Sequence, residues 1–158
     1  MQNAQKLSHA ADVFYNKGRA VAWFNQVLYP LKKPLKMKPS VFFEGFENFL
    51  DSRSDFHSGS DADSVKIEKL QLAYLDALYT KAKKQRLLDA VHDIVRFGGA
   101  WARALVDGIT TNIAFNYDPD AVLGGMDIEN FVASTKKALH PIQTQVQPGK
   151  DEPQLVLR

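Results

Sequence analysis

Cysteine is absent from this chain of 158 residues, and its absence excludes several kinds of site. Without a thiol, the chain can form no disulfide, no thiolate metal site and no cysteine nucleophile. No apolar run approaches the roughly 20 residues that a membrane-spanning helix needs. The first eleven residues contain Lys6 and His9 and no apolar run, so they do not resemble a signal peptide. We therefore expect a cytoplasmic protein that makes no contact with the membrane.

Histidine is also scarce, and its four copies predict no metal site. No two of them lie four residues apart, the spacing at which two histidines on a helix share a zinc ion. His92-Asp93, with His57 upstream and aspartates downstream, has the residue order of helical metal-dependent phosphohydrolases. A dipeptide this common carries little information, and we expect both side chains to line the polar flank of a helix.

Motifs for other ligands are missing too. Asp118 and Asp120 begin a stretch that resembles a calcium loop, but Val122 occupies the fifth loop position, where an oxygen ligand is needed. Gly98-Gly99 lacks the lysine and hydroxyl residue that complete a phosphate-binding loop. With no Ser-His-Asp order and no recognisable catalytic carboxylate pair, we expect no cofactor, no metal and no enzymatic activity.

The strongest positive signal is a helical apolar period between Ser64 and Phe97. Aspartates and serines before it can cap its start, and Gly98-Gly99 predicts its end. An unbroken helix of this length would span roughly 48 Å, longer than a compact domain of this size needs. We therefore expect the basic segment 80–86 either to be a solvated helical middle or to interrupt the helix. The apolar positions are Ile67, Leu70, Tyr74, Leu78, Leu88, Val91 and Val95.

The same periodicity predicts an all-α fold of about five helices around this central one. Prolines at 30, 34 and 39 predict an extended linker between the first two helices. Residues 1–140 form the expected helical domain, and residues 141–158 an irregular tail, flexible or bound to a partner. Strands are expected only near Gly18 or in the tail. The expected helices are 4–29, 40–52, 64–97, 100–116 and 127–140. The expected core is Phe14, Val21, Phe24, Phe46, Phe49, Leu70, Tyr74, Leu88, Val91, Val95, Trp101, Leu105 and Phe131.

Charge is grouped along the chain although the net charge is only +2. Two basic blocks alternate with two acidic ones, 39–63 and 89–129. Lysine-rich segments of this kind can lie along a phosphate backbone, but the acidic blocks can equally neutralise them across the folded surface. The candidate nucleic-acid contacts are Lys32, Lys33, Lys36, Lys38, Lys81, Lys83, Lys84 and Arg86.

Two functions from different classes remain. The first is a non-enzymatic protein-interaction module, an adaptor, inhibitor or accessory subunit, because the apolar run Leu155, Val156 and Leu157 has no obvious core to join. The alternative is a helical accessory protein that binds nucleic acid through its lysine-rich patches. Another protein is thus the first expected partner and nucleic acid the second, and a homo-oligomer is compatible with the sequence.

Overall fold

The computed structural model describes residues 23–52 and 64–158. Phe14, Val21, the turn expected at Gly18, His57 and most of the first expected helix lie outside these residues. The helices are α2 Phe24–Leu28, α3 Pro39–Asp51, α4 Ser64–Lys81, α5 Leu88–Ala102, α6 Pro119–Val122 and α7 Ile128–Ser134, and the strands are β1 Thr111–Phe115, β2 Ile142–Gln147 and β3 Gln154–Leu157. Short 3₁₀ turns, Tyr29–Leu31 and Gln85–Leu87, follow α2 and precede α5.

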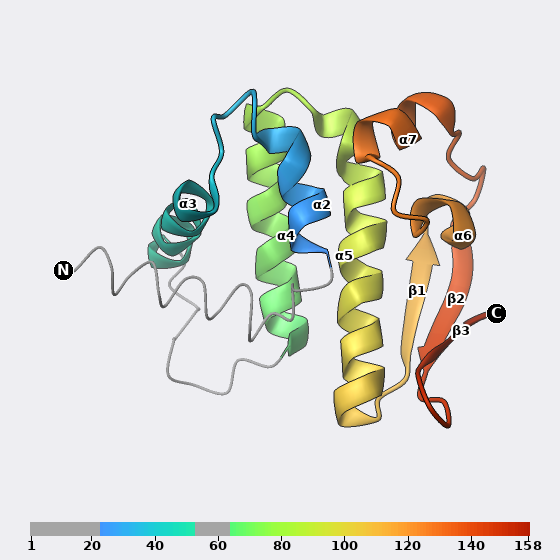
Figure 1. Cartoon of the computed structure of the whole chain (residues 1–158). Helices are drawn as coiled ribbons and strands as arrows, with labels where there is room; N and C mark the ends of the chain where they lie inside the picture. The colour runs from blue at the N-terminus through green and yellow to red at the C-terminus, as the bar shows by residue number, and fades with distance from the viewer. Residues whose placement is uncertain (1–22, 53–63) are drawn as a thin grey trace.

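Helix α5 is the centre of the arrangement (Figure 1). It packs along α4 on one side and against β1 and β2 on the other, while α2 lies next to both α4 and α5 and α3 lies beyond α4. The fold is therefore mostly helical, as expected, but the all-α prediction is wrong, because a small sheet covers one side of α5 and its strand β1 lies outside the tail, where strands were allowed. Among the described residues, no helix is long and apolar enough to span a membrane.

The long helix expected from 64 to 97 is broken in the basic segment. Helix α4 ends at Lys81, and the chain reverses before α5 begins at Leu88. Folding back lets the apolar stripes of the two halves face each other, and Leu75 and Val91 are both fully buried. A straight helix would leave one of these stripes without a packing surface, so the hydrophobic gain favours the break.

The glycines expected to end that helix lie inside α5 instead. A β-carbon on Gly98 would collide with the indole of Trp23, and one on Gly99 would collide with the carboxylate of Glu68. Both glycines therefore permit close approach of a neighbouring element rather than a helix end, and α5 continues to Ala102. A π-helical turn, Arg103–Asp107, then leads to Gly108, whose φ of +67° ends the helix.

The segment 111–115 was expected to be helical and is strand β1. It pairs antiparallel with β2, and β2 pairs antiparallel with β3, so the expected irregular tail forms two strands of the sheet. Side chains on one face, including Ile113, Phe115 and Val146, are buried against the helices. Ile113 and Phe115 are buried and the residues between and before them are more exposed, but only pairing with a segment about 30 residues later gives that pattern a sheet to belong to.

The remaining helices follow the sequence more closely. Helix α3 lies within one residue of its expected bounds, although it begins at Pro39 with no side-chain cap. Asp127 caps α7 by accepting hydrogen bonds from the main-chain N–H groups of Glu129 and Asn130. Helix α7 ends at Ser134, six residues early, and leaves Leu139 almost fully exposed.

The predicted core is largely confirmed where it can be examined. Seven of its members are buried, and three others, Phe49, Leu88 and Trp101, are partly buried and pack against them. Leu105 is wrong, because it lies in the π-helical turn with 60% of its surface exposed. The buried seven are Phe24, Phe46, Leu70, Tyr74, Val91, Val95 and Phe131.

Candidate nucleic-acid interface

The two basic segments, separated by about 50 residues in the sequence, meet in the folded chain. Lys84 Nζ donates a hydrogen bond of 2.9 Å to the carbonyl oxygen of Pro30, and the same ammonium pairs with Glu129 of α7. The linker between α2 and α3 and the turn between α4 and α5 accordingly lie at the same end of the helices (Figure 1). Lys84 therefore ties three elements together while it is only partly exposed.

We call the group of cations around this contact the basic end. Lys84 is its half-buried member, and the other six side chains are exposed. Lys38, the eighth predicted contact, directly precedes α3 and is excluded from the group. The basic end consists of Lys32, Lys33, Lys36, Lys81, Lys83, Lys84 and Arg86.

Counter-charge at the basic end is limited. Glu129 pairs with Lys84 and lies 3.6 Å from Arg86, and Asp127 lines the same hollow as Lys84. Within the described part of the chain, Lys33, Lys36, Lys81 and Lys83 have no ion-pair partner. The neutralisation by acidic blocks that the sequence allowed is therefore incomplete at this end.

Both turns of the basic end have the same unusual backbone. In the second, the N–H of Lys84 donates to the carbonyl of Tyr79 and the N–H of Lys83 to that of Thr80, which is the Schellman pattern at a helix end. In the first, the N–H of Met37 donates to the carbonyl of Lys32 and the N–H of Lys36 to that of Lys33, which is the same pattern. That pattern needs a left-handed residue, usually glycine, yet Lys36 and Lys83 occupy it with φ of 50° and 58°.

Left-handed lysines cost stability. A residue with a side chain is less stable than glycine in this conformation by roughly 1–2 kcal/mol. Glycine keeps only part of this advantage, because its unfolded chain is more flexible and loses more entropy on folding. Among the described residues other than glycine, Lys36 and Lys83 alone have positive φ. Folding stability therefore does not explain why these two positions carry lysine.

Replacing Lys83 with glycine is thus expected to raise the free energy of unfolding by roughly 0.5 to 1 kcal/mol. Lys81 provides the matched control, because it has the same side chain at the last helical position of α4. There glycine should lower stability by up to about 1 kcal/mol. Urea unfolding of the two variants checks the opposite signs, and destabilisation by both would show that Lys83 is not strained.

A hollow of about 440 Å³, with several charged side chains in its lining, opens at the basic end. Its walls come from the first basic segment, from Lys84, and from the start of α7. Tyr29 also lines it with 60% of its surface exposed, and the ammonium of Lys32 lies 5.9 Å from the centroid of its ring. Tyr29 was not among the residues predicted from the sequence, although an aromatic residue shortly before a lysine-rich segment was a usable signal. The hollow is lined by Tyr29, Pro30, Lys32, Lys33, Lys84, Asp127, Glu129 and Asn130.

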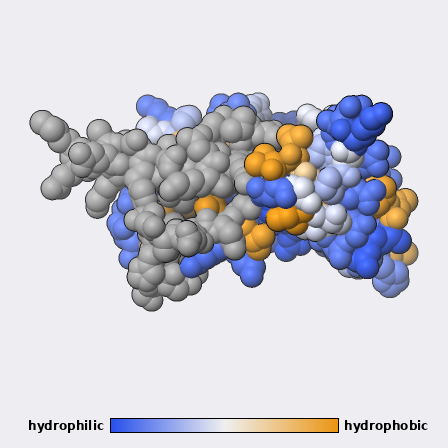
Figure 2. Space-filling model, turned by 90° about the horizontal axis from the view of Figure 1, so that it is seen from below, coloured by the Kyte–Doolittle hydropathy of each residue, from blue (hydrophilic) through white to orange (hydrophobic). Residues whose placement is uncertain are grey.

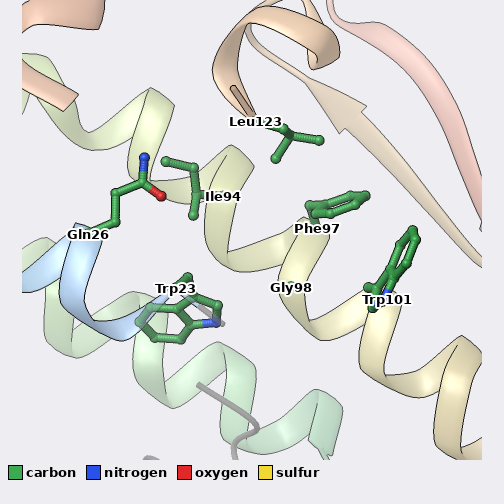
Figure 3. A pocket seen from close by; sticks show the side chains of 7 residues that line it. All are labelled: Trp23, Gln26, Ile94, Phe97, Gly98, Trp101 and Leu123. Atoms are coloured by element: carbon green, nitrogen blue, oxygen red, sulfur yellow. The ribbon is translucent and has the colours of Figure 1, made fainter. Parts of the chain in front are cut away.

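A second hollow, of about 260 Å³, lies elsewhere, between α2, α5 and the turn after α6 (Figure 3). Trp23 and Leu123 approach it from opposite sides of α5, and Phe97 and Trp101 extend it along that helix. Gln26 is its polar side chain, and that amide already donates to the carbonyl of Met126 at 3.1 Å. The hollow is therefore largely apolar, and the amide nitrogen of Gln26 is already engaged.

The other candidate residues from the sequence lie in strand β3 or in helix α5. Leu155 packs against the core from β3, Val156 lies on the opposite face of that strand, and Leu157 is 74% exposed. Within 23–52 and 64–158, no three histidine, aspartate or glutamate side chains cluster as a metal site would require. Asp93 is fully buried rather than on a polar flank, whereas His92 is half-buried and pairs with Asp76 at 2.6 Å.

Comparison of the sequence with protein-family models gives no match, and comparisons with curated proteins and with solved structures give none either.

Proposed function

We propose that this chain is a nucleic-acid-binding accessory protein that holds the phosphate backbone at its basic end. The observation that carries the proposal is the contact of Lys84 with Pro30 and Glu129, which brings two distant lysine-rich segments to one surface. Exposed cations in such a group release counterions from a nucleic acid when they bind its phosphates. The proposal therefore requires affinity that falls steeply with salt.

The left-handed lysines support this function. Lys36 and Lys83 are held in conformations that glycine would adopt at lower cost, and both are exposed on the two turns that Lys84 holds together. Strain that stability does not require is commonly found where a side chain serves binding. Two rigid turns that each present a lysine would meet a phosphate backbone with little further ordering.

Changing Lys33, Lys36 and Lys83 together to glutamine should weaken binding at least about tenfold at 0.1 M salt. The slope of log affinity against log salt should become shallower by roughly 2 to 3 units, because each lost phosphate contact removes about one. Fluorescence anisotropy with a labelled oligonucleotide over a series of salt concentrations measures both quantities. Lys84 is left unchanged because it holds the two segments together.

The matched control changes Lys66, Lys69 and Lys150, exposed lysines outside the basic end, to glutamine. It removes the same total charge, so it should shift the affinity slightly and leave the slope almost unchanged. An equal loss in both triple variants would show diffuse attraction rather than a site. A wild-type protein with no salt-dependent binding to any oligonucleotide would contradict the proposed function itself.

The second candidate is a non-enzymatic protein-interaction module that binds an apolar partner segment. Leu155 no longer supports it, since this residue packs in the sheet, but Leu105, Val106 and Ile109 do. These side chains are 60%, 68% and 48% exposed around the π-helical turn, at the lower end of Figure 1, where hydrophobic surface is visible in Figure 2. Binding there would bury apolar area and change little with salt, so a salt series distinguishes the two candidates.

A further inference from the structure

Tyr29 differs from the other tyrosines that the structure describes. Tyr74, Tyr79 and Tyr117 are buried, and the hydroxyl groups of the first two donate hydrogen bonds to main-chain carbonyls. Tyr29 instead exposes 60% of its surface at the mouth of the hollow in the basic end. An exposed aromatic ring beside lysines offers an apolar surface next to the cations that would hold phosphates, so this position suits a ligand with an aromatic group of its own.

The ring is carried on rigid backbone. Leu28 and Leu31 are almost completely buried, and the intervening Pro30 is buried with its carbonyl bonded to Lys84. The main chain at Tyr29 is thus fixed from both sides, which reduces the entropy lost when a ligand orders the side chain. Lys32, whose ammonium lies over the ring at 5.9 Å, is close enough to reach a phosphate attached to a group stacked there.

The wall of the hollow at the start of α7 is polar, and its positive and negative charges nearly balance. Glu129 pairs with Lys84 and lies near Arg86, and the carboxylate of Asp127 accepts hydrogen bonds from the start of its own helix. Asn130 adds an exposed side-chain amide to this wall, a group that can donate and accept hydrogen bonds at the edge of a base. The hollow therefore combines an aromatic face, cations for phosphates and an amide.

We infer that the nucleic acid bound at the basic end is single-stranded, with one base stacked on Tyr29 and the adjoining phosphates held by Lys32 and Lys33. This inference rests on the proposed function. In a duplex the faces of the bases are covered by their neighbours, so only an unpaired base can present its face to the ring. Stacking tolerates any base, and the site therefore selects strandedness rather than sequence.

The test compares probes that share their phosphates but differ in bases. The wild-type protein and Tyr29→Ala, Tyr29→Trp and Tyr29→Leu variants are titrated with labelled oligo-dT, oligo-rU, an abasic strand of equal length and a blunt duplex. Tyr29→Ala should weaken binding of oligo-dT or oligo-rU roughly 5- to 150-fold and leave the abasic strand unchanged. Tyr29→Trp should retain the wild-type affinity, whereas Tyr29→Leu, apolar but not aromatic, should resemble Tyr29→Ala. Comparison of oligo-dT with oligo-rU shows whether the natural strand is DNA or RNA.

The possible results distinguish failure of the stacking inference from failure of the proposed function. If Tyr29→Ala binds oligo-dT and oligo-rU as tightly as the wild type, or if the duplex binds as tightly as the single strands, the stacking inference is overturned while salt-dependent binding preserves the proposed function. If inorganic polyphosphate competes as well as oligo-dT of equal charge, the site reads charge alone and the inference is again wrong. If no probe binds with salt dependence, both fail. Thermal unfolding of each variant confirms that it is folded, which its exposed position favours.

Discussion

Replacing Arg103 with leucine is expected to lower the free energy of unfolding by about 3–5 kcal/mol near neutral pH. Arg103 is 4% exposed, and its Nη1 donates to Glu68 Oε1 at 3.2 Å. The pair connects the π-helical turn after α5 to α4 across Gly99, and the Nε of Arg103 also lies 3.4 Å from the hydroxyl of Thr111 in β1. Loss of the guanidinium would leave the largely buried Glu68 carboxylate, 14% exposed, without its hydrogen-bonded partner.

The loss should depend on pH in a defined direction. Burial raises the pKa of Glu68, and Arg103 opposes that rise. Without Arg103 the pKa rises further, so folded Glu68 binds a proton at a pH where the unfolded chain does not. The variant should therefore recover stability as the pH falls through the raised pKa of Glu68, relative to the wild-type protein.

Urea unfolding of a double-mutant cycle measures the effect. The double variant Glu68→Leu, Arg103→Leu should be more stable than Arg103→Leu alone, because it removes the unpaired buried charge. The exposed pair of Lys137 and Asp89, with a shorter separation of 2.6 Å, provides the control. Lys137→Leu should change stability far less than Arg103→Leu does, and an equal loss would show that burial is not the cause.

The second large effect is expected at Asp93, whose replacement by alanine should cost about 2–4 kcal/mol. Its fully buried carboxylate accepts hydrogen bonds from the main-chain N–H groups of Asn116 and Tyr117 and from the side-chain amide of Asn116, at 3.0–3.1 Å. These bonds attach the end of β1 to the middle of α5. Alanine would leave the donors without this acceptor, and each buried unsatisfied group costs about 1–3 kcal/mol.

Asp93 also predicts a pH dependence of folding. Burial raises the pKa of its carboxyl group from 3.8 to about 6, against the opposing effect of its hydrogen bonds. Below pH 4 both the folded and the unfolded chain hold the proton, and between about pH 4 and 6 only the folded chain does. Its contribution to stability therefore falls as the pH rises through this window, by at most about 3 kcal/mol, and is constant above it.

The Asp93→Asn variant isolates this contribution, because asparagine has nearly the same shape and does not titrate. The stability difference between wild type and Asp93→Asn, measured by urea unfolding from pH 4 to 8, should move in favour of the variant as the pH rises to 6. A difference that stays constant over this range would show that Asp93 does not titrate there. Other carboxyl groups titrate in both proteins and cancel in the comparison.

Local chemistry alone determined much of this protein. The helical period of α4 and of α5 and the bounds of α3 depend on residues within a few positions of one another, so the sequence was enough to predict them. The linker predicted to be extended instead begins with the 3₁₀ turn Tyr29–Leu31 and a second turn that ends at the left-handed Lys36, so that prediction is wrong. The exposure of the lysines at 32, 33, 36, 81 and 83 was equally predictable, because an unpaired ammonium is rarely buried. At this level the sequence identified a mostly helical fold and two candidate basic segments.

Only tertiary structure decided where those segments lie and what accompanies them. The break after Lys81 follows from burying two apolar stripes against each other, and the sheet follows from pairing Phe115 with Ile142 across a distance in sequence that no local pattern encodes. The same packing gave Gly98 and Gly99 a role inside α5 and placed Lys84 against Pro30. Burial and strand pairing are properties of contacts between distant segments, and the free energy of those contacts outweighed local helix propensity wherever the two disagreed.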